Sequence, residues 1–270
     1  MITENIKRIT TKVIVEMKKS GEKISALTAY DYIIAKMLDD AGMDIILVGD
    51  SLGNVFQGQE TTLPVTVDEI IYHTKAVRRA VKRSLVVVDM PFLSYQISIE
   101  DAVRNCGRVL KETGAEAIKI EGGKPMVETI RRLVEVGIPV MGHLGLTPQS
   151  IHKFGSYEVR GKAKTEAENI LKDAKELEKA GAFSIVLEKI PYGLAKKVTD
   201  AVSIPTIGIG AGKHCDGQIL VCYDMLGMFE DFQPKFARKY ANLAKIIRNS
   251  FDNYLKDVKT GKFPNKEESF

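Results

Sequence analysis

Eight short apolar runs recur along the chain, and each is followed by a polar or glycine-containing end. Runs of this length that are rich in Val and Ile are typical of parallel strands buried on both faces of a sheet. We therefore expect strands at residues 23–30, 44–51, 85–92, 117–123, 139–146, 183–190, 205–212 and 217–224.

The segments between these runs carry the start and stop signals of helices. The start signals are Pro125 and the pairs Thr66/Glu69, Ser98/Asp101 and Thr165/Glu168, which have capping-box spacing. The stop signals are glycines that follow a helical pattern, namely Gly42, Gly114, Gly137 and Gly181. Between Thr165 and Gly181 apolar residues recur with a helical period, which predicts that one face of this helix packs on the sheet.

Strand and helix alternate eight times, which predicts parallel strands and is the number that closes a (β/α)8 TIM barrel. A doubly wound open sheet is the alternative, but the first strand leads into Leu27-Thr28-Ala29-Tyr30-Asp31 and not into a glycine-rich dinucleotide fingerprint. We expect one barrel domain over residues 1–270. It would have an N-terminal helical segment at 1–22, a closing helix at 234–256 and a charged tail at 259–270.

Composition and charge narrow the class of protein. A net charge of +4 on 270 residues gives no basic stripe, so we expect no nucleic-acid partner. The apolar runs are strand-sized and the first residues do not resemble a signal peptide, so we expect no membrane partner. An odd number of cysteines, Cys106, Cys215 and Cys222, fits reduced thiols and a cytoplasmic location.

Two carboxylates stand at the ends of apolar runs, Asp50 after Ile45-Ile46-Leu47-Val48-Gly49 and Asp89 after Leu85-Val86-Val87-Val88. An ionised group beside a strand buried on both faces is costly unless it is paired or binds a metal. A hard divalent cation is a partner that two carboxylates can share, with substrate oxygens completing its coordination.

Further ionisable residues end the neighbouring strands. Lys119 and Glu121 are two residues apart and would both face the barrel axis, and His143 and Glu188 end the next two strands. Because catalytic groups of such barrels lie at the carboxyl ends of the strands, these residues are candidate site residues. A structural salt bridge is the other explanation for each, and for Glu188 its partner would be Lys189 or Lys119.

The ligand types favour Mg²⁺ or Mn²⁺ over zinc, since the strand ends carry carboxylates, no nearby cysteine and His143 as the one imidazole. Asp50 and Asp89 would suffice as direct ligands, and Glu121 would be a third ligand or would hold a bound water. Lys119 could bind a substrate carboxylate, stabilise an enolate or form a Schiff base, and Glu188 could act as a carboxylate base.

Five segments, in order along the chain, carry a resemblance to the ketopantoate (3-methyl-2-oxobutanoate) hydroxymethyltransferase family. They are Leu47-Val48-Gly49-Asp50-Ser51-Leu52-Gly53, Val88-Asp89-Met90-Pro91-Phe92, Ile118-Lys119-Ile120-Glu121-Gly122-Gly123, Gly142-His143-Leu144-Gly145-Leu146-Thr147-Pro148-Gln149 and Thr206-Ile207-Gly208-Ile209-Gly210-Ala211-Gly212. The similarity covers the chain from about Ile9 to Asp231.

The resemblance implies a barrel that assembles as a decamer of two pentameric rings, with one Mg²⁺ per subunit and 5,10-methylenetetrahydrofolate as co-substrate. It implies that Asp50 and Asp89 bind the metal, that Ser51 and Lys119 bind the keto acid, and that Glu188 is the proton acceptor. Glu121 would belong to the metal site. The implied reaction converts 3-methyl-2-oxobutanoate to ketopantoate through a metal-stabilised enolate, in pantothenate biosynthesis.

Other assignments stay open at this stage. His143 is inward by position and is either a substrate contact or a structural group, and the long segments 52–64 and 147–162 are the expected lids and folate contacts. Tyr30 is a candidate wall residue, and Lys213, His214 and Cys215 have no assigned role. Two rival functions remain. The first is a Mg²⁺-dependent carbon–carbon lyase of the isocitrate lyase and phosphonopyruvate type, although the usual Lys-Lys-Cys-Gly loop of those enzymes is not visible in this sequence. The second is a non-catalytic binding barrel.

Overall fold

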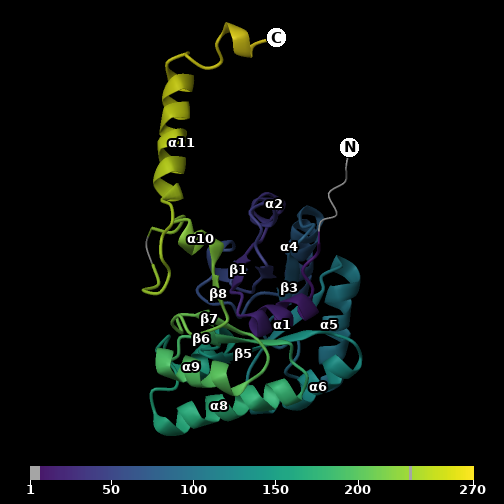
Figure 1. Ribbon diagram of the computed structural model, residues 1–270. Coiled ribbons are helices and arrows are strands. Elements are labelled where there is room, and N and C mark those ends of the chain that lie inside the picture. Colours follow the sequence, from purple (N-terminus) through teal and green to yellow (C-terminus); the bar gives the residue numbers. More distant parts are fainter. Residues whose placement is uncertain (1–6, 231–232) are drawn as a thin grey trace. The chain divides into compact units, whose positions relative to one another are not determined.

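The computed structural model describes residues 7–230 and 233–270, and within them eight parallel strands close into a barrel in sequence order (Figure 1). The strands are β1 (Ile24–Thr28), β2 (Ile45–Val48), β3 (Leu85–Asp89), β4 (Ala117–Glu121), β5 (Val140–Gly145), β6 (Ser184–Glu188), β7 (Thr206–Ile209) and β8 (Gly217–Leu220). Each strand lies inside its expected range, so the predicted (β/α)8 barrel is confirmed.

Helices connect the strands of the barrel. They are α1 (Thr11–Ser20), α2 (Tyr32–Asp40), α3 (Leu52–Val55), α4 (Val67–Ala80), α5 (Ile99–Thr113), η1 (Lys124–Met126), α6 (Val127–Glu135), η2 (Pro148–Ser150), α7 (Ile151–Phe154), α8 (Lys164–Lys179) and α9 (Tyr192–Ala201). No helix among the described residues is both long and apolar enough to cross a membrane.

The chain divides into two compact units, Met1–Val221 with the barrel and Cys222–Phe270. The second unit contains α10 (Cys222–Met225), α11 (Leu243–Lys259) and the short η3 (Lys266–Glu268). The helix expected from residue 234 begins instead at Leu243, because Asn242 supplies the N-cap by accepting from the Lys245 N–H. The last apolar run also ends early, since residues from Cys222 form α10 and not strand.

The N-terminal segment was expected to be helical over residues 1–22. Helix α1 covers Thr11–Ser20 of it, while residues 1–6 lie outside the described part of the chain. Ile14 and Met17 of α1 are buried against Ile24 and other inward residues near the starts of the strands. Because α1 packs at this end, the opposite end, where the strands finish, is left for chemistry.

The predicted helix signals are mostly confirmed. Thr66 and Glu69 form a complete capping box at α4, and Ser98 accepts from the Asp101 N–H at α5. The prediction for Thr165 was wrong, because α8 already begins at Lys164 without a side-chain cap. All four glycine stops have positive φ, the left-handed conformation that ends a helix at low cost for glycine.

Candidate functional site

The strand register brings the predicted ionisable residues together at the carboxyl end of the barrel. Asp89 of β3 lies opposite Lys119 of β4, and Glu121 lies opposite His143 of β5. Glu188 ends β6 opposite Gly145. Asp50 lies just beyond β2, separated by Gly49 from Val48, where the strand ends. Apart from Glu188, which is partly exposed, these ionisable side chains are buried.

Lys119 and Asp89 form a buried ion pair. The Lys119 Nζ lies 2.6 Å and 2.7 Å from the two carboxylate oxygens of Asp89, and 3.8 Å from Glu121 Oε1. Burial lowers the pKa of Lys119, but the surrounding carboxylates, Asp89 foremost, outweigh it and raise the pKa above its ordinary value. The lysine is therefore a fixed cation at the centre of the site.

His143 lies between two carboxylates. Its Nδ1 is 3.2 Å from Glu121 Oε1 and its Nε2 is 3.3 Å from Glu188 Oε2, although neither nitrogen makes a well-directed hydrogen bond. Burial and Lys119 both lower the pKa of His143, yet Glu121 and Glu188 raise it overall to about 9. The two carboxylates therefore favour the charged form of His143, which lies between Glu121 and Glu188.

Asp50 is the least compensated carboxylate of the group. Burial raises its pKa well above the ordinary value, and the negative charges of Asp89 and Glu121 raise it further. Lys119 and a hydrogen bond from the Gln149 Nε2, 2.9 Å from Asp50 Oδ2, act in the opposite direction. Close like charges in a buried site favour a bound cation.

Ser51 stands beside the predicted wall residue Tyr30. The two hydroxyl oxygens are 2.9 Å apart, and Tyr30 is buried. The sequence predicts Tyr30 as a wall residue at the end of the first strand, and the structure places its hydroxyl beside the residue that follows Asp50. This contact fixes the Ser51 hydroxyl at the edge of the acidic group.

Gln149, which sequence reasoning quoted but gave no role, joins the end of β2 to the ends of β3 and β4. Its Nε2 donates to Asp50 and to the Met90 carbonyl at 2.8 Å, and its backbone N–H donates to Glu121 Oε2 at 3.0 Å. Its Oε1 accepts from the Tyr95 hydroxyl at 2.7 Å and from the Gln96 Nε2 at 3.1 Å. The one signal that could have found it is its place in η2, the short helical turn that follows the fifth strand.

The residues present fit a magnesium ion by their chemistry. Four carboxylates lie near the Lys119 ammonium and the His143 ring, so carboxylates are in excess and a divalent cation would offset them. Among residues 7–230 and 233–270, no three His, Cys, Asp or Glu side chains form a ready metal cage. A metal held by Asp50 and Asp89 would take its other oxygens from substrate and water, which is the usual coordination of Mg²⁺ in enzymes.

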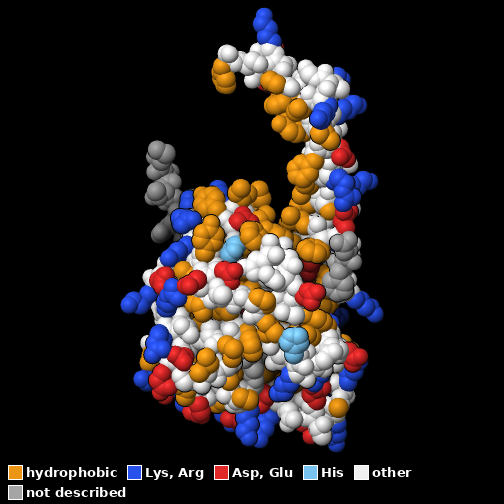
Figure 2. Space-filling model, turned by 180° about the vertical axis from the view of Figure 1, so that it is seen from behind, with side chains coloured by type: hydrophobic (Ala, Val, Ile, Leu, Met, Phe, Trp, Pro, Cys, Tyr) orange, Lys and Arg blue, Asp and Glu red, His pale blue; other side chains and the backbone are white. Residues whose placement is uncertain are grey.

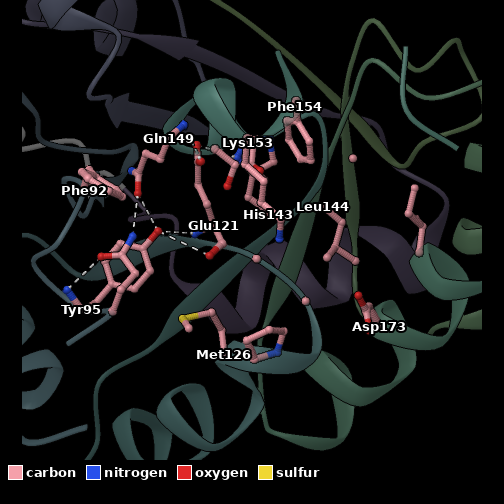
Figure 3. A pocket seen from close by; sticks show the side chains of 18 residues that line it. Phe92, Tyr95, Glu121, Met126, His143, Leu144, Gln149, Lys153, Phe154 and Asp173 are labelled. Carbon is pink, nitrogen blue, oxygen red and sulfur yellow. Dashed lines mark hydrogen bonds and ion pairs between the residues drawn. The ribbon is translucent and has the colours of Figure 1, made fainter. Parts of the chain in front are cut away.

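A cavity of about 360 Å³ opens beside this group of residues (Figure 3). Glu121, His143 and Gln149 line it, together with residues of the segment 147–162 that was expected to act as a lid. The other expected lid, 52–64, contributes no residue to its lining. Outside the cavity, the unassigned His214 stacks on Tyr192, with ring centroids 5.3 Å apart.

Solved structures that resemble this chain share its fold at low sequence identity. A phosphonopyruvate hydrolase in complex with oxalate and Mg²⁺ has a TM-score of 0.62 and 11% identity, covering 96% of this chain and 93% of its own. A 2,3-dimethylmalate lyase, a member of the PEP mutase/isocitrate lyase superfamily, has a TM-score of 0.62 and 16% identity, covering 97% and 89%. At this low identity, these similarities concern the fold alone.

Relatives by sequence are far closer. The 3-methyl-2-oxobutanoate hydroxymethyltransferase of Prosthecochloris aestuarii is 56% identical, over 99% of this chain and 98% of the relative. The enzyme of the same name from Flavobacterium johnsoniae is 57% identical, over 99% and 98%. The model of the family described as ketopantoate hydroxymethyltransferase matches residues 8–266. The chain therefore belongs to the ketopantoate hydroxymethyltransferase family.

Proposed function

We propose that this protein transfers a hydroxymethyl group from 5,10-methylenetetrahydrofolate to 3-methyl-2-oxobutanoate and so makes ketopantoate, the first step of pantothenate biosynthesis. The observation that carries the proposal is the continuous line of ionisable groups Asp89, Lys119, Glu121, His143 and Glu188, at the strand ends of a chain in this family. A structural barrel has no need to bury so many charges at one end.

Asp50 and Asp89 hold one Mg²⁺ per subunit, and Glu121 belongs to the same metal site. When bound, the metal withdraws charge from the keto oxygen and makes the C3 proton more acidic. Gln149 supports this role by holding Asp50 and Glu121 in place through separate hydrogen bonds.

Ser51 and Lys119 bind the keto acid. The Lys119 ammonium is fixed by Asp89, so it presents positive charge where negative charge develops on the substrate as the proton leaves. The Ser51 hydroxyl, held by Tyr30, supplies a neutral hydrogen bond beside it. Asp50 and Asp89 would act on the substrate by holding the metal, and His143 forms a wall of the substrate site.

Glu188 is the base that takes the C3 proton onto its carboxylate. The His143 Nε2 lies 3.3 Å from Glu188 Oε2, beside the carboxylate that would accept the proton. The partial exposure of Glu188, the least buried of the charged group, lets it reach a substrate held over the axis.

The lyase alternative has no specific support. The two solved structures compared above are 11% and 16% identical to this chain. Identity this low indicates a shared fold but not a shared site. The sequence also lacks the cysteine loop that those enzymes usually carry.

We further propose that the protein is a homo-oligomer, a decamer of two pentamers, in the cytoplasm. Helix α11 buries none of its residues, and its apolar side chains, such as Phe251 and Tyr254, lie exposed. Figure 2 shows hydrophobic side chains open to the surface. On the barrel unit, Ile33 and Met37 of α2 are also exposed. Exposed apolar faces of this kind are typical of surfaces that a partner subunit covers. The buried free thiols of Cys106 and Cys215 suit a reducing compartment.

One assay tests the proposed reaction. The purified protein is mixed with 3-methyl-2-oxobutanoate, methylenetetrahydrofolate and Mg²⁺, and ketopantoate is measured by mass spectrometry. We expect product that disappears when a chelator is added and returns with excess Mg²⁺. Absence of ketopantoate with all three components present would contradict the proposal.

A further inference from the structure

The cavity beside the site extends away from the residues proposed to bind the keto acid. Glu121 and His143 form one part of its lining, and Phe154 of α7 and Asp173 of α8 form another (Figure 3). Ser51 and Lys119 are not among the residues that line it. The cavity is therefore free to hold a second molecule while the keto acid occupies the barrel axis.

The walls of the cavity combine apolar surface with polar side chains, which suits a heterocyclic ring with a polar edge. Its volume of about 360 Å³ is within the range of sites that bind drug-sized molecules. Met126, Leu144 and Phe154 provide apolar surface, and the backbone of Gly122, Gly123 and Gly145 provides wall without side chains. A Cβ at Gly145 would lie 2.2 Å from the Glu188 carbonyl oxygen, so glycine is required there for close packing.

Asp173 places a carboxylate in this apolar setting. It is half-buried, and no lysine, arginine or histidine of the described chain lies within ion-pair distance of it. Burial raises the pKa of Asp173, and a hydrogen bond from the Lys124 backbone opposes this. Its side chain lies against Gly123, where a Cβ would be 1.9 Å from Asp173 Oδ2. A carboxylate so placed can accept hydrogen bonds from paired N–H donors on the edge of a heterocycle.

We propose that this cavity binds the reduced pterin ring of the folate co-substrate, with Asp173 accepting hydrogen bonds from the amino-pyrimidine edge of the ring. The proposal rests on the proposed function, and it assigns the site of the second substrate.

The location suits the chemistry. His143 lines the cavity and its Nε2 is 3.3 Å from the Glu188 carboxylate, which is the proposed base. A pterin in the cavity therefore lies next to the place where the C3 proton is removed. The one-carbon unit on the pterin would then approach the keto acid from the side of the cavity.

The test uses the full-length protein with Mg²⁺ and keto acid, and tetrahydrofolate without a one-carbon unit as the probe. Asp173→Asn keeps the shape and an acceptor for the Lys124 N–H, but it removes the charge. We expect the Kd for tetrahydrofolate, measured by calorimetry, to rise about tenfold or more in this variant. Exchange of the C3 proton in deuterated buffer, which needs no folate, should continue. Glu176→Gln is the matched control, because Glu176 is on the same helix, pairs with Lys179 and does not line the cavity.

A second variant keeps the proposal testable if Asp173→Asn does not fold. Met126→Trp fills the cavity and should also weaken tetrahydrofolate binding while exchange continues. Wild-type tetrahydrofolate affinity in either folded variant would overturn the proposal. The proposal would also be overturned if Asp173→Asn lowered the melting temperature and the rate of C3-proton exchange in proportion to tetrahydrofolate binding. That result would mean that Asp173 only stabilises the fold. Failure of the wild type to exchange the C3 proton would instead refute the proposed function, and with it this assignment.

Discussion

Replacement of Gln149 by methionine tests whether hydrogen bonds between the strand ends hold the site together. Methionine has a similar length and flexibility, but it can neither donate to Asp50 and Met90 nor accept from Tyr95. The backbone hydrogen bond to Glu121 would persist, since it does not depend on the side chain. The substitution thus removes one set of contacts and leaves the chain path intact.

The expected loss follows from the groups that are left without a partner. A buried polar group deprived of its hydrogen bond costs about 1–3 kcal/mol. Tyr95 can recover part of this, because its hydroxyl already lies 3.4 Å from the Glu121 carbonyl. We therefore expect the free energy of unfolding to fall by about 3 kcal/mol, which lowers the melting temperature by roughly 6–12 °C in a chain of this size.

Calorimetry and C3-proton exchange together decide this prediction. Gln149→Met should lower the affinity for Mg²⁺ and slow exchange by about tenfold or more, because Asp50 is no longer held in position. Gln96→Met is the control, since it removes one hydrogen bond to Gln149 and a longer one, of 3.4 Å, from the Tyr95 backbone N–H, but none to Asp50. Its effect on stability should be about 1 kcal/mol, with little effect on Mg²⁺ binding. If both variants were equally stable and bound Mg²⁺ equally, the reasoning would be wrong.

Three further predictions concern single residues. Burial would raise the pKa of Asp39, but hydrogen bonds from Ser84 and its neighbours lower it overall, so Asp39→Asn should destabilise the protein by about 1–2 kcal/mol at neutral pH. In urea titrations, the difference in stability between the variant and the wild type should shrink as the pH falls below about 4. A difference that does not depend on pH would contradict the prediction. Thr66→Ala removes the capping box with Glu69 and should cost about 1 kcal/mol in the same titrations, and no loss would mean that packing alone holds α4. Asp50→Asn should raise the melting temperature of the metal-free protein while abolishing the stabilisation by added Mg²⁺, whereas a retained Mg²⁺ effect would exclude Asp50 as a ligand.

The barrel could be predicted because its strands are buried on both faces. All residues of β2, β3 and β4 are buried, so their apolar runs stand out from the amphipathic helices between them. The candidate site could be predicted for the same reason, because a charged residue such as Lys119 or Glu121 interrupts the apolar run of a buried strand. The line of ion pairs then follows from the register of neighbouring strands.

Other features depended on contacts that the sequence does not display. Gln149 follows Thr147-Pro148 and looks like an ordinary loop residue, and its role exists only because three strand ends converge on it. The short helices α3 and α7 have too few residues for a periodic pattern to emerge. Asp173 belongs to a regular helix and is distinguished only by the cavity that it lines.

Exchange of the C3 proton of 3-methyl-2-oxobutanoate, followed by NMR in deuterated buffer, tests the central claim most directly. The account predicts Mg²⁺-dependent exchange in the wild type and none in Glu188→Gln, with keto-acid binding by calorimetry largely kept. The neutral amide has the same shape and can still lie near His143 Nε2, but it cannot accept the proton. Undiminished exchange in Glu188→Gln would contradict the assignment of the base, and exchange that is unaffected by a chelator would contradict the metal site.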